Sequence, residues 1–129
     1  MKRSGRRRNT DLELAGRWYR VVVNRGAVCA ACGGRQRLQA HHVIPQQVLR
    51  RYAAEMRLSV AETQAILWDV RNGIALCVRC HERHTNAVVR FPRARLPKLV
   101  WAFAQELDGR YWPVSRQPMQ MRLEREYAT

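Results

Sequence analysis

The sequence predicts a mainly helical α+β fold in which two short strands lie among helices. Apolar residues recur at helical spacing in several segments, whereas the apolar stretches with strand character are short. At 129 residues the chain has the length of one domain. Its cysteines form two Cys-x-x-Cys pairs, Cys29/Cys32 and Cys77/Cys80. A domain of this size is therefore expected to combine a modest hydrophobic core with a metal ion that joins the two pairs.

Each helix and strand is predicted from a local pattern. An apolar stripe that includes Trp18 predicts an amphipathic first helix that packs on the core. Ser59 and Glu62 have the spacing of a capping box, which predicts the start of a helix. Asp108 and Gly109 are expected to end the helix before them. Helices are expected at residues 11–24, 46–57, 60–70, from the second cysteine pair to about 89, 96–107 and 119–127, and strands at 37–44 and 74–76.

The chain is strongly basic. It has 24 Lys and Arg residues against 10 Asp and Glu residues, a formal net charge of +14 and an isoelectric point near 11.3. This balance favours a polyanionic partner, with nucleic acid as the first candidate. No apolar run approaches the ~20 residues that span a membrane, so we expect no membrane partner. Residues 1–10 are basic and are followed by Asp11 and Glu13, which predicts a flexible basic arm, no secretory signal and a cytoplasmic location.

The two cysteine pairs match the two halves of a tetrahedral Cys₄ zinc site. Residues 33–76 separate them, a segment longer than the ~15–20 residues of a compact zinc ribbon. The ion is therefore expected to join segments that carry a strand, two helices and a second strand between them. Two alternatives explain less. The run CVRCH at 77–81 could attach a haem, but this would leave Cys29 and Cys32 without a role, and four buried unliganded cysteines would make the paired spacing a coincidence.

The histidines beside these cysteines are expected to face in other directions. On a helix, His81 would be rotated by ~100° from Cys80 around the axis. His41 and His42 lie at the end of a predicted strand, where consecutive side chains point to opposite faces. The cysteines can therefore bind one ion while His81 faces the histidine pair, and the two histidines of that pair can have different roles.

The motifs CxxC at 29–32, AHHVIP at 40–45 and DVRNGIALCxxCH at 69–81 together resemble the HNH endonuclease family in its zinc-stapled form, over about residues 18–90. The resemblance implies a ββα-metal core, or His-Me finger, with flanking helices. In this core two strands and a helix hold one catalytic divalent ion, and the Cys₄ zinc joins the ends of these elements. The expected division of the chain is a basic arm at 1–10, a nuclease domain at 11–107 with its core at 27–90, and a tail at 108–129.

The resemblance also implies roles for single residues. His41 resembles a ligand of the catalytic ion, His81 a second ligand, and His42 the general base. Asn72 resembles the middle asparagine of the family, which organises the loop between the strands and orients the base. A neutral imidazole with an ordinary pKa near 6.5 can accept a proton from water at neutral pH, which agrees with the role of His42.

One position departs from the family pattern. Many members have a histidine or asparagine four residues after the position of His81, where this chain has Thr85, and His84 lies one place earlier. Residues four apart on a helix lie within ~40° of each other and residues three apart within ~60°, so Thr85 and His84 both remain candidates for a third ligand. Arg83 is a candidate DNA phosphate contact, although on so basic a chain an arginine more often contributes general electrostatics.

These residues and the resemblance predict a metal-dependent DNA endonuclease that hydrolyses phosphodiester bonds and leaves 5′-phosphate and 3′-hydroxyl ends. Its catalytic ion would be Mg²⁺, Mn²⁺, Ni²⁺ or Zn²⁺, beside a structural Zn²⁺. The alternative is a noncatalytic zinc-stapled DNA-binding module. Small enzymes of this kind occur in phages, mobile elements and restriction systems. A larger nuclease or packaging assembly is therefore a candidate partner besides DNA. If the chain is encoded by a phage, we expect it in the cytoplasm of the host.

Overall fold

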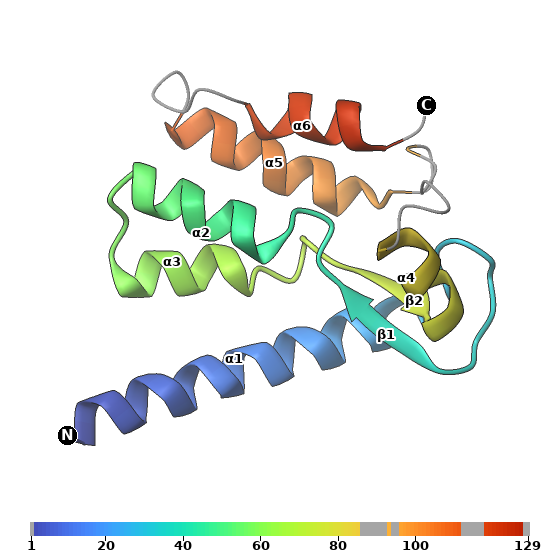
Figure 1. The fold of residues 1–129 in the computed structure, drawn as a ribbon, viewed down its shortest axis with the longest axis horizontal. Coiled ribbons are helices and arrows are strands. Elements are labelled where there is room, and N and C mark those ends of the chain that lie inside the picture. The colour runs from blue at the N-terminus through green and yellow to red at the C-terminus, as the bar shows by residue number, and fades with distance from the viewer. Residues whose placement is uncertain (1, 86–92, 94–95, 112–117, 128–129) are drawn as a thin grey trace.

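The computed structural model describes residues 2–85, 93, 96–111 and 118–127, with side chains from residue 11 onward except at 111. Figure 1 shows α2 and α3 as an antiparallel pair between α1 on one side and the antiparallel pair of α5 and α6 on the other, with the sheet and α4 at one end. No helix in these ranges is long and apolar enough to cross a membrane. The elements are α1 (Lys2–Gly26), β1 (Leu38–His41), α2 (Gln46–Glu55), α3 (Val60–Leu67), β2 (Ile74–Cys77), α4 (Val78–Thr85), α5 (Lys98–Tyr111) and α6 (Met119–Glu126).

Helix α1 begins well before the predicted start at Asp11. Its backbone is already helical at Lys2, so the structure continues the helix through the segment that we expected to form a flexible arm. Arginine and lysine have high helix propensity, and a helix fixed by packing further along can propagate through such residues. The predicted stripe is confirmed where α1 packs, because Trp18 and Val22 are buried and the helix contacts both strands.

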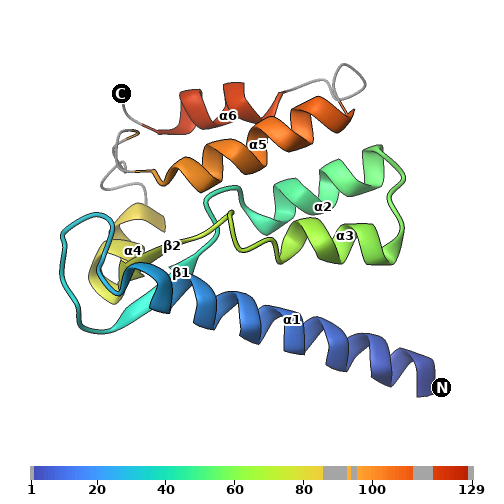
Figure 2. The same cartoon turned by 180° about the vertical axis from the view of Figure 1, so that it is seen from behind.

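Gly73, just before β2, allows α1 to approach closely. A Cβ at this position would lie 2.6 Å from Cγ2 of Val22 and 3.0 Å from Cζ2 of Trp18. Arg25, at the end of α1, also joins this helix to the turn before β2. Its guanidinium donates hydrogen bonds to the carbonyls of Val70 at 2.7 Å and Gly73 at 2.8 Å. The C-terminal half of α1 is therefore fixed against the turn that leads into β2. Figure 2 shows from behind that this end of α1 lies beside the two strands.

The two predicted strands are present and form an antiparallel sheet. Leu38 lies opposite Cys77, and His41 lies opposite Ile74. Helix α4 follows β2 without a break and contacts both strands. The predicted continuation of this helix to about residue 89 lies outside the described residues.

The segment between the strands folds into the hairpin of α2 and α3, and the predicted capping box is confirmed. Ser59 Oγ accepts a hydrogen bond from the Glu62 N–H at 3.1 Å, and Glu62 Oε1 accepts one from the Ser59 N–H at 3.0 Å. Helix α3 ends at Leu67, earlier than predicted, because a turn follows in which the Asp69 carbonyl accepts from the Asn72 N–H at 3.0 Å.

The predicted helix end at Asp108–Gly109 is wrong, because α5 continues to Tyr111. Asp108 instead caps the next helix. Its carboxylate accepts hydrogen bonds from the backbone N–H groups of Met119 at 2.7 Å and Gln120 at 3.1 Å, where a negative charge also interacts favourably with the helix dipole.

Helix α6 belongs to the core, although its residues were expected to form a tail. Leu123 is fully buried and Tyr127, just after α6, is 3% exposed. Both pack in the same cluster as the central apolar side chains of α2, β2 and α5. The reason lies in the spacing of Met119, Leu123 and Tyr127, which puts one apolar residue on the same helical face at every turn.

Candidate functional site

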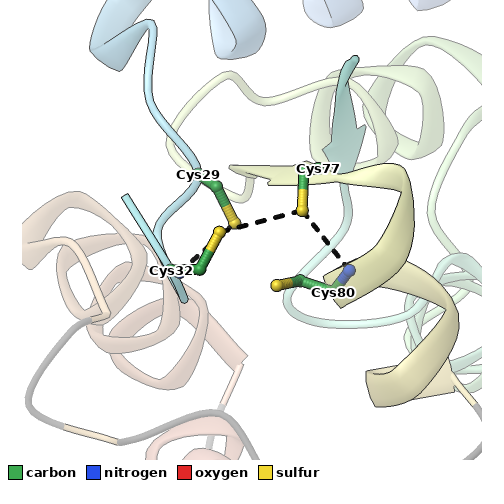
Figure 3. Close-up of side chains that lie close together, drawn as sticks. All are labelled: Cys29, Cys32, Cys77 and Cys80. Atoms are coloured by element: carbon green, nitrogen blue, oxygen red, sulfur yellow. Dashed lines mark hydrogen bonds between the residues drawn. The ribbon is translucent and has the colours of Figure 1, made fainter. Parts of the chain in front are cut away.

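The four cysteines meet at the end of the sheet. Figure 3 shows Cys29 and Cys32, from the loop after α1, turned toward Cys77 and Cys80, from the end of β2 and the start of α4. Their sulfur atoms all lie within 4.8 Å of one another, and those of Cys32 and Cys77 are 3.9 Å apart. Four sulfurs at ~2.3 Å from a tetrahedral Zn²⁺ are ~3.8 Å apart, so this cluster could bind one structural zinc ion.

The backbone around the first pair folds back on the sulfur atoms. Gly33 has a φ of +79°, a conformation that glycine adopts without steric strain, and its N–H donates to the Cys29 carbonyl at 2.8 Å. The N–H of Cys32 points to Cys29 Sγ at 3.5 Å and that of Gly34 to Cys32 Sγ at 3.4 Å. The second pair repeats the first of these contacts, from the Cys80 N–H to Cys77 Sγ at 3.4 Å. Such N–H groups favour thiolates, the form that binds metal.

The pKa values of Cys29 and Cys80 also favour a bound cation. Burial raises the pKa of Cys29, but the backbone N–H groups of Cys77, Cys32 and Ala31 outweigh it and bring that pKa down to about 6. Burial and the neighbouring thiols raise the pKa of Cys80 to about 12. Cys29 thus loses its proton readily, whereas burial and the neighbouring thiols disfavour the thiolate of Cys80. A bound cation would stabilise both thiolates.

Three histidines of β1 and α4 lie close to one another. The ring centroid of His41, at the end of β1, lies 5.1 Å from that of His81 and 5.1 Å from that of His84, both on α4. Two imidazoles bound to one ion at ~2.0–2.1 Å, with a tetrahedral angle between them, would have their centroids ~5 Å apart. The two centroid distances from His41 are therefore compatible with imidazoles that share an ion. Among the described residues, the four cysteines are the group whose ligand atoms lie close enough together to hold a metal ion.

His84 and Thr85, the two candidates for a third metal ligand, differ in burial and direction. His84 is half-buried and faces His41, whereas Thr85 is exposed. Nδ1 of His84 is buried and has no hydrogen-bond partner among the described residues. A buried nitrogen in this state can accept a hydrogen bond or bind a metal ion, so the structure favours His84 over Thr85 as the candidate third ligand.

His41 is neutral in this environment. Burial, and then the nearby rings of His84, His81 and His42, lower its pKa to about 3. Its lone pair is therefore available near neutral pH, which is the form that a metal ion requires.

His42 faces away from His41, His81 and His84. Its ring is held by an aromatic contact on one face and by a hydrogen bond at one nitrogen. Its ring stacks on Trp18, with centroids 3.8 Å apart and an interplanar angle of 14°, and meets the edge of Trp68 at 5.6 Å. Nε2 lies 2.9 Å from the Leu67 carbonyl oxygen. A carbonyl can only accept, so Nε2 carries the proton and Nδ1 is the basic nitrogen. Burial lowers the pKa of His42, although the bond to Leu67 opposes this shift, so the neutral form prevails near neutral pH.

The sequence did not reveal the residues that hold His42. The apolar stripe of α1 predicted that Trp18 is buried, but its partner depends on how α1 packs against the turn before β2. Trp18 is fixed there because its Nε1–H donates to the Asp69 carbonyl at 3.1 Å. Trp68 donates from Nε1 to Asp11 Oδ1 at 2.8 Å. Neither contact has a signature in sequence spacing.

Asn72 joins the turn before β2 to the loop after β1. Its side chain is fully buried, accepts a hydrogen bond from the Ile44 N–H at 2.8 Å and donates one to the Ile44 carbonyl at 3.0 Å. These bonds hold the backbone two residues after His42. The ring of His42 itself is bonded to Leu67, so the contribution of Asn72 to its orientation passes through the loop backbone.

Arg83 and Arg71 differ in whether their guanidinium groups are held by other side chains. Arg83 is exposed on α4. Arg71 is held by Asp69 at 2.7 Å, by Glu106 and by the ring of Phe103, with its guanidinium carbon 5.4 Å from the ring centroid. Arg71 therefore supports the fold, and Arg83 is the one of these two that a phosphate could reach.

Comparison with protein families gives a match to the HNH endonuclease family over residues 29–91. Comparison with curated proteins gave no match, and comparison with solved structures gave none. The matched segment begins at Cys29 and contains all four cysteines and all four histidines, and so both clusters. Residues 29–91 therefore match the HNH endonuclease family, and the four-cysteine cluster within them is consistent with its zinc-stapled form.

Proposed function

We propose that the protein is a metal-dependent DNA endonuclease that hydrolyses phosphodiester bonds with His42 as the general base. The observation that carries this proposal is the divergence of two adjacent histidines. His41 faces His81 and His84, while His42 faces away from them with its Nε2–H held by a carbonyl. A protein that only bound DNA would have no use for a neutral histidine fixed in one tautomer beside a set of metal ligands.

His42 has the properties that a general base requires. Its neutral form, with the proton on Nε2, leaves Nδ1 to take a proton from water as the water oxygen attacks phosphorus. The bond from phosphorus to the 3′ oxygen then breaks, and the leaving oxygen takes a proton from solvent. The products are a 5′-phosphate and a 3′-hydroxyl. Stacking on Trp18 restricts the ring, so Nδ1 keeps its direction during this step.

His41, His81 and His84 would hold the catalytic ion. The distances from His41 to the other two rings suit imidazoles that share one cation, and the half-buried His84 has a nitrogen available for it. A divalent ion bound there would stabilise the charge that develops on the phosphate and on the leaving 3′ oxygen. In this proposal β1, β2 and α4 form a ββα-metal core. Thr85 has no ligand role in it.

The four cysteines would hold a structural Zn²⁺ next to this core. Cys77 and Cys80 lie on the same short segment as His81 and His84, so a zinc that fixes the cysteines also fixes the start of α4. The zinc would thereby position two ligands of the second ion without taking part in the reaction.

DNA is the proposed substrate because of charge and exposure. The chain has a net charge of +14, and Arg83 is exposed on the helix that carries His81 and His84. Phosphate contacts of this kind make affinity strongly dependent on salt, so binding is expected to weaken steeply as the salt concentration rises.

The experiment that tests this function is plasmid cleavage by the purified, zinc-loaded protein. Supercoiled DNA is incubated with Mg²⁺, Mn²⁺, Ni²⁺ or Zn²⁺ in turn, and with EDTA as a control. We expect nicked or linear DNA with at least one cation and none with EDTA. Binding to the same DNA is measured in parallel. Tight binding without cleavage under every cation would contradict the proposal and favour the noncatalytic DNA-binding module.

A further inference from the structure

We propose that two aromatic residues from outside the matched segment, Trp18 and Tyr127, position the two functional kinds of histidine separately. Trp18 would orient the base His42, and Tyr127 would orient the metal ligand His84. This inference rests on the proposed function for the roles of the two histidines. It goes beyond that function by assigning to α1 and to the residue after α6, which the family match does not include, a direct part in the site.

Trp18 is a rigid support for His42. It is 4% exposed, and its indole lies 3.8 Å from the imidazole centroid and nearly parallel to it. The indole cannot easily turn, because Nε1–H is bonded to the Asp69 carbonyl and the ring packs closely over Gly73. The face of His42 is thus fixed by Trp18, while its in-plane rotation is fixed by the Leu67 carbonyl. Together these contacts define where Nδ1 points.

Tyr127 is the corresponding support for His84. It is 3% exposed, and its ring stacks on His84 with centroids 5.9 Å apart and an interplanar angle of 12°. Its hydroxyl donates to the Val43 carbonyl at 2.8 Å, which anchors the phenol to the loop just after His42. Tyr127 therefore connects α4 to the end of β1 from the far end of the chain.

The two supports contact different histidines, so their loss should have different consequences. A displaced base lowers the rate of the chemical step, and misplacement by ~1 Å can lower it ~100-fold, without changing affinity for metal or DNA. A displaced ligand weakens metal binding, typically ~10–100-fold when an outer contact of a ligand is lost. A merely structural role would lower stability in both cases and change neither property selectively.

The first test measures the imidazoles directly and needs no activity. ¹⁵N-edited NMR of the zinc-loaded protein, without a second metal, is expected to show His42 with its proton on Nε2 and its ring protons shifted upfield by the stacked indole. Trp18→Phe should keep an upfield shift, and Trp18→Leu should lose it. Ring-proton shifts of His42 that stay the same in Trp18→Leu would overturn the assignment of Trp18.

The second test separates the base from the rest of the enzyme. Trp18→Leu is expected to lower kcat ~10–100-fold with little change in KM for DNA, and Trp18→Phe to stay within ~5-fold of the wild type. Both variants lose the bond to Asp69, so their difference reports the stacked ring. Trp101→Leu, at the half-buried tryptophan of α5 beside Arg93, is the matched control and should leave kcat unchanged. Equal kcat in Trp18→Leu and Trp18→Phe would contradict the proposal.

The third test measures metal affinity by calorimetry, with Ni²⁺ titrated into the zinc-loaded protein. Tyr127→Leu is expected to weaken Ni²⁺ binding ~10-fold or more, and Tyr127→Phe ~3-fold, because the anchor to Val43 is lost while the stack remains. Tyr52→Phe is the matched control, since Tyr52 is also buried and donates its hydroxyl to a backbone carbonyl, that of Leu107 at 3.1 Å. It should bind Ni²⁺ as the wild type does.

These outcomes distinguish failure of this inference from failure of the proposed function. If Tyr127→Leu does not fold, the comparison of Tyr127→Phe with Tyr52→Phe decides, and equal Ni²⁺ affinities would overturn the assignment of Tyr127. If the wild type cleaves no DNA, the proposed function fails, while the NMR and calorimetric results still test whether Trp18 and Tyr127 hold the two histidines. If the wild type cleaves DNA and neither aromatic residue affects its histidine, only the present inference fails.

Discussion

Nε2 of His42 lies 2.9 Å from the carbonyl oxygen of Leu67, the last residue of α3. This contact sets the tautomer of the ring, because the acceptor has no proton to give and the imidazole must supply one. The basic nitrogen is then Nδ1. The position at which α3 ends therefore decides which nitrogen of His42 is free to accept a proton.

The dependence of the cleavage rate on pH follows from the state of His42. In the proposed mechanism His42 acts as the base in its neutral form, and burial lowers its pKa, so this form persists at pH values below the usual 6.5 of histidine. We predict a single-turnover rate at saturating cation that is level between about pH 7 and 8 and falls only below about pH 6.5. A tenfold rise per pH unit across the upper range would contradict this, since it would indicate attack by free hydroxide without a base.

The cysteine cluster can be tested through zinc content and stability. Cys77→Ser should reduce bound zinc from about one ion per chain to nearly none, because three thiolates and a hydroxyl hold Zn²⁺ poorly. It should also lower the melting temperature by about 10 °C or more, as expected for a loss of ~3 kcal/mol or more. Elemental analysis and thermal denaturation measure the two effects. His81→Ala is the control, and zinc loss in that variant would mean that the histidine, not the cysteine, holds the first ion.

Asn72 is predicted to be essential for stability. Asn72→Ala leaves the N–H and the carbonyl of Ile44 without partners in a buried position, at a penalty of ~1–3 kcal/mol for each unsatisfied group. We expect the free energy of unfolding, measured by urea denaturation, to fall by ~2–4 kcal/mol. Asn24→Ala, at an exposed position of α1, should change it by less than ~0.5 kcal/mol. Similar values for the two variants would show that the Asn72 bridge contributes nothing.

Two glycines allow a paired prediction on the packing of α1. Gly73→Ala puts a methyl group 2.6 Å from Val22 and 3.0 Å from Trp18, so we expect a loss of ~1–3 kcal/mol in unfolding free energy. Gly109 lies inside α5, and no atom of the described residues would come within 4 Å of a Cβ there, so Gly109→Ala should stabilise the protein by ~0.5–1 kcal/mol. Calorimetric or urea unfolding of both variants checks this. A Gly73→Ala variant as stable as the wild type would contradict the close approach of α1.

The sequence predicted the features that depend on neighbours along the chain. Ser59 and Glu62 cap each other across three residues, so their pattern is complete in itself. Asp108 misled the prediction because it caps α6 rather than ending α5, and its partners Met119 and Gln120 are distant in sequence. Local patterns cannot reveal such a contact.

The histidines that we propose as ligands of the catalytic ion illustrate the same limit. Helical geometry left Thr85 and His84 both open, since it gives directions around α4 but not the direction from which β1 approaches. The structure turns His84 toward His41. Likewise, the apolar stripe predicted that Trp18 is buried, yet the stack on His42 follows only from the packing of α1 near Gly73.

The most direct test of the central claim is a single-turnover cleavage measurement on supercoiled DNA, at saturating cation, with wild type, His42→Ala and Gln47→Ala, the last an exposed position on α2. Removal of a general base should lower the rate ~10²–10⁴-fold. We predict a loss of this size in His42→Ala, with unchanged zinc content and DNA affinity, and a wild-type rate in Gln47→Ala. A His42→Ala protein that cleaves as fast as the wild type would contradict the account.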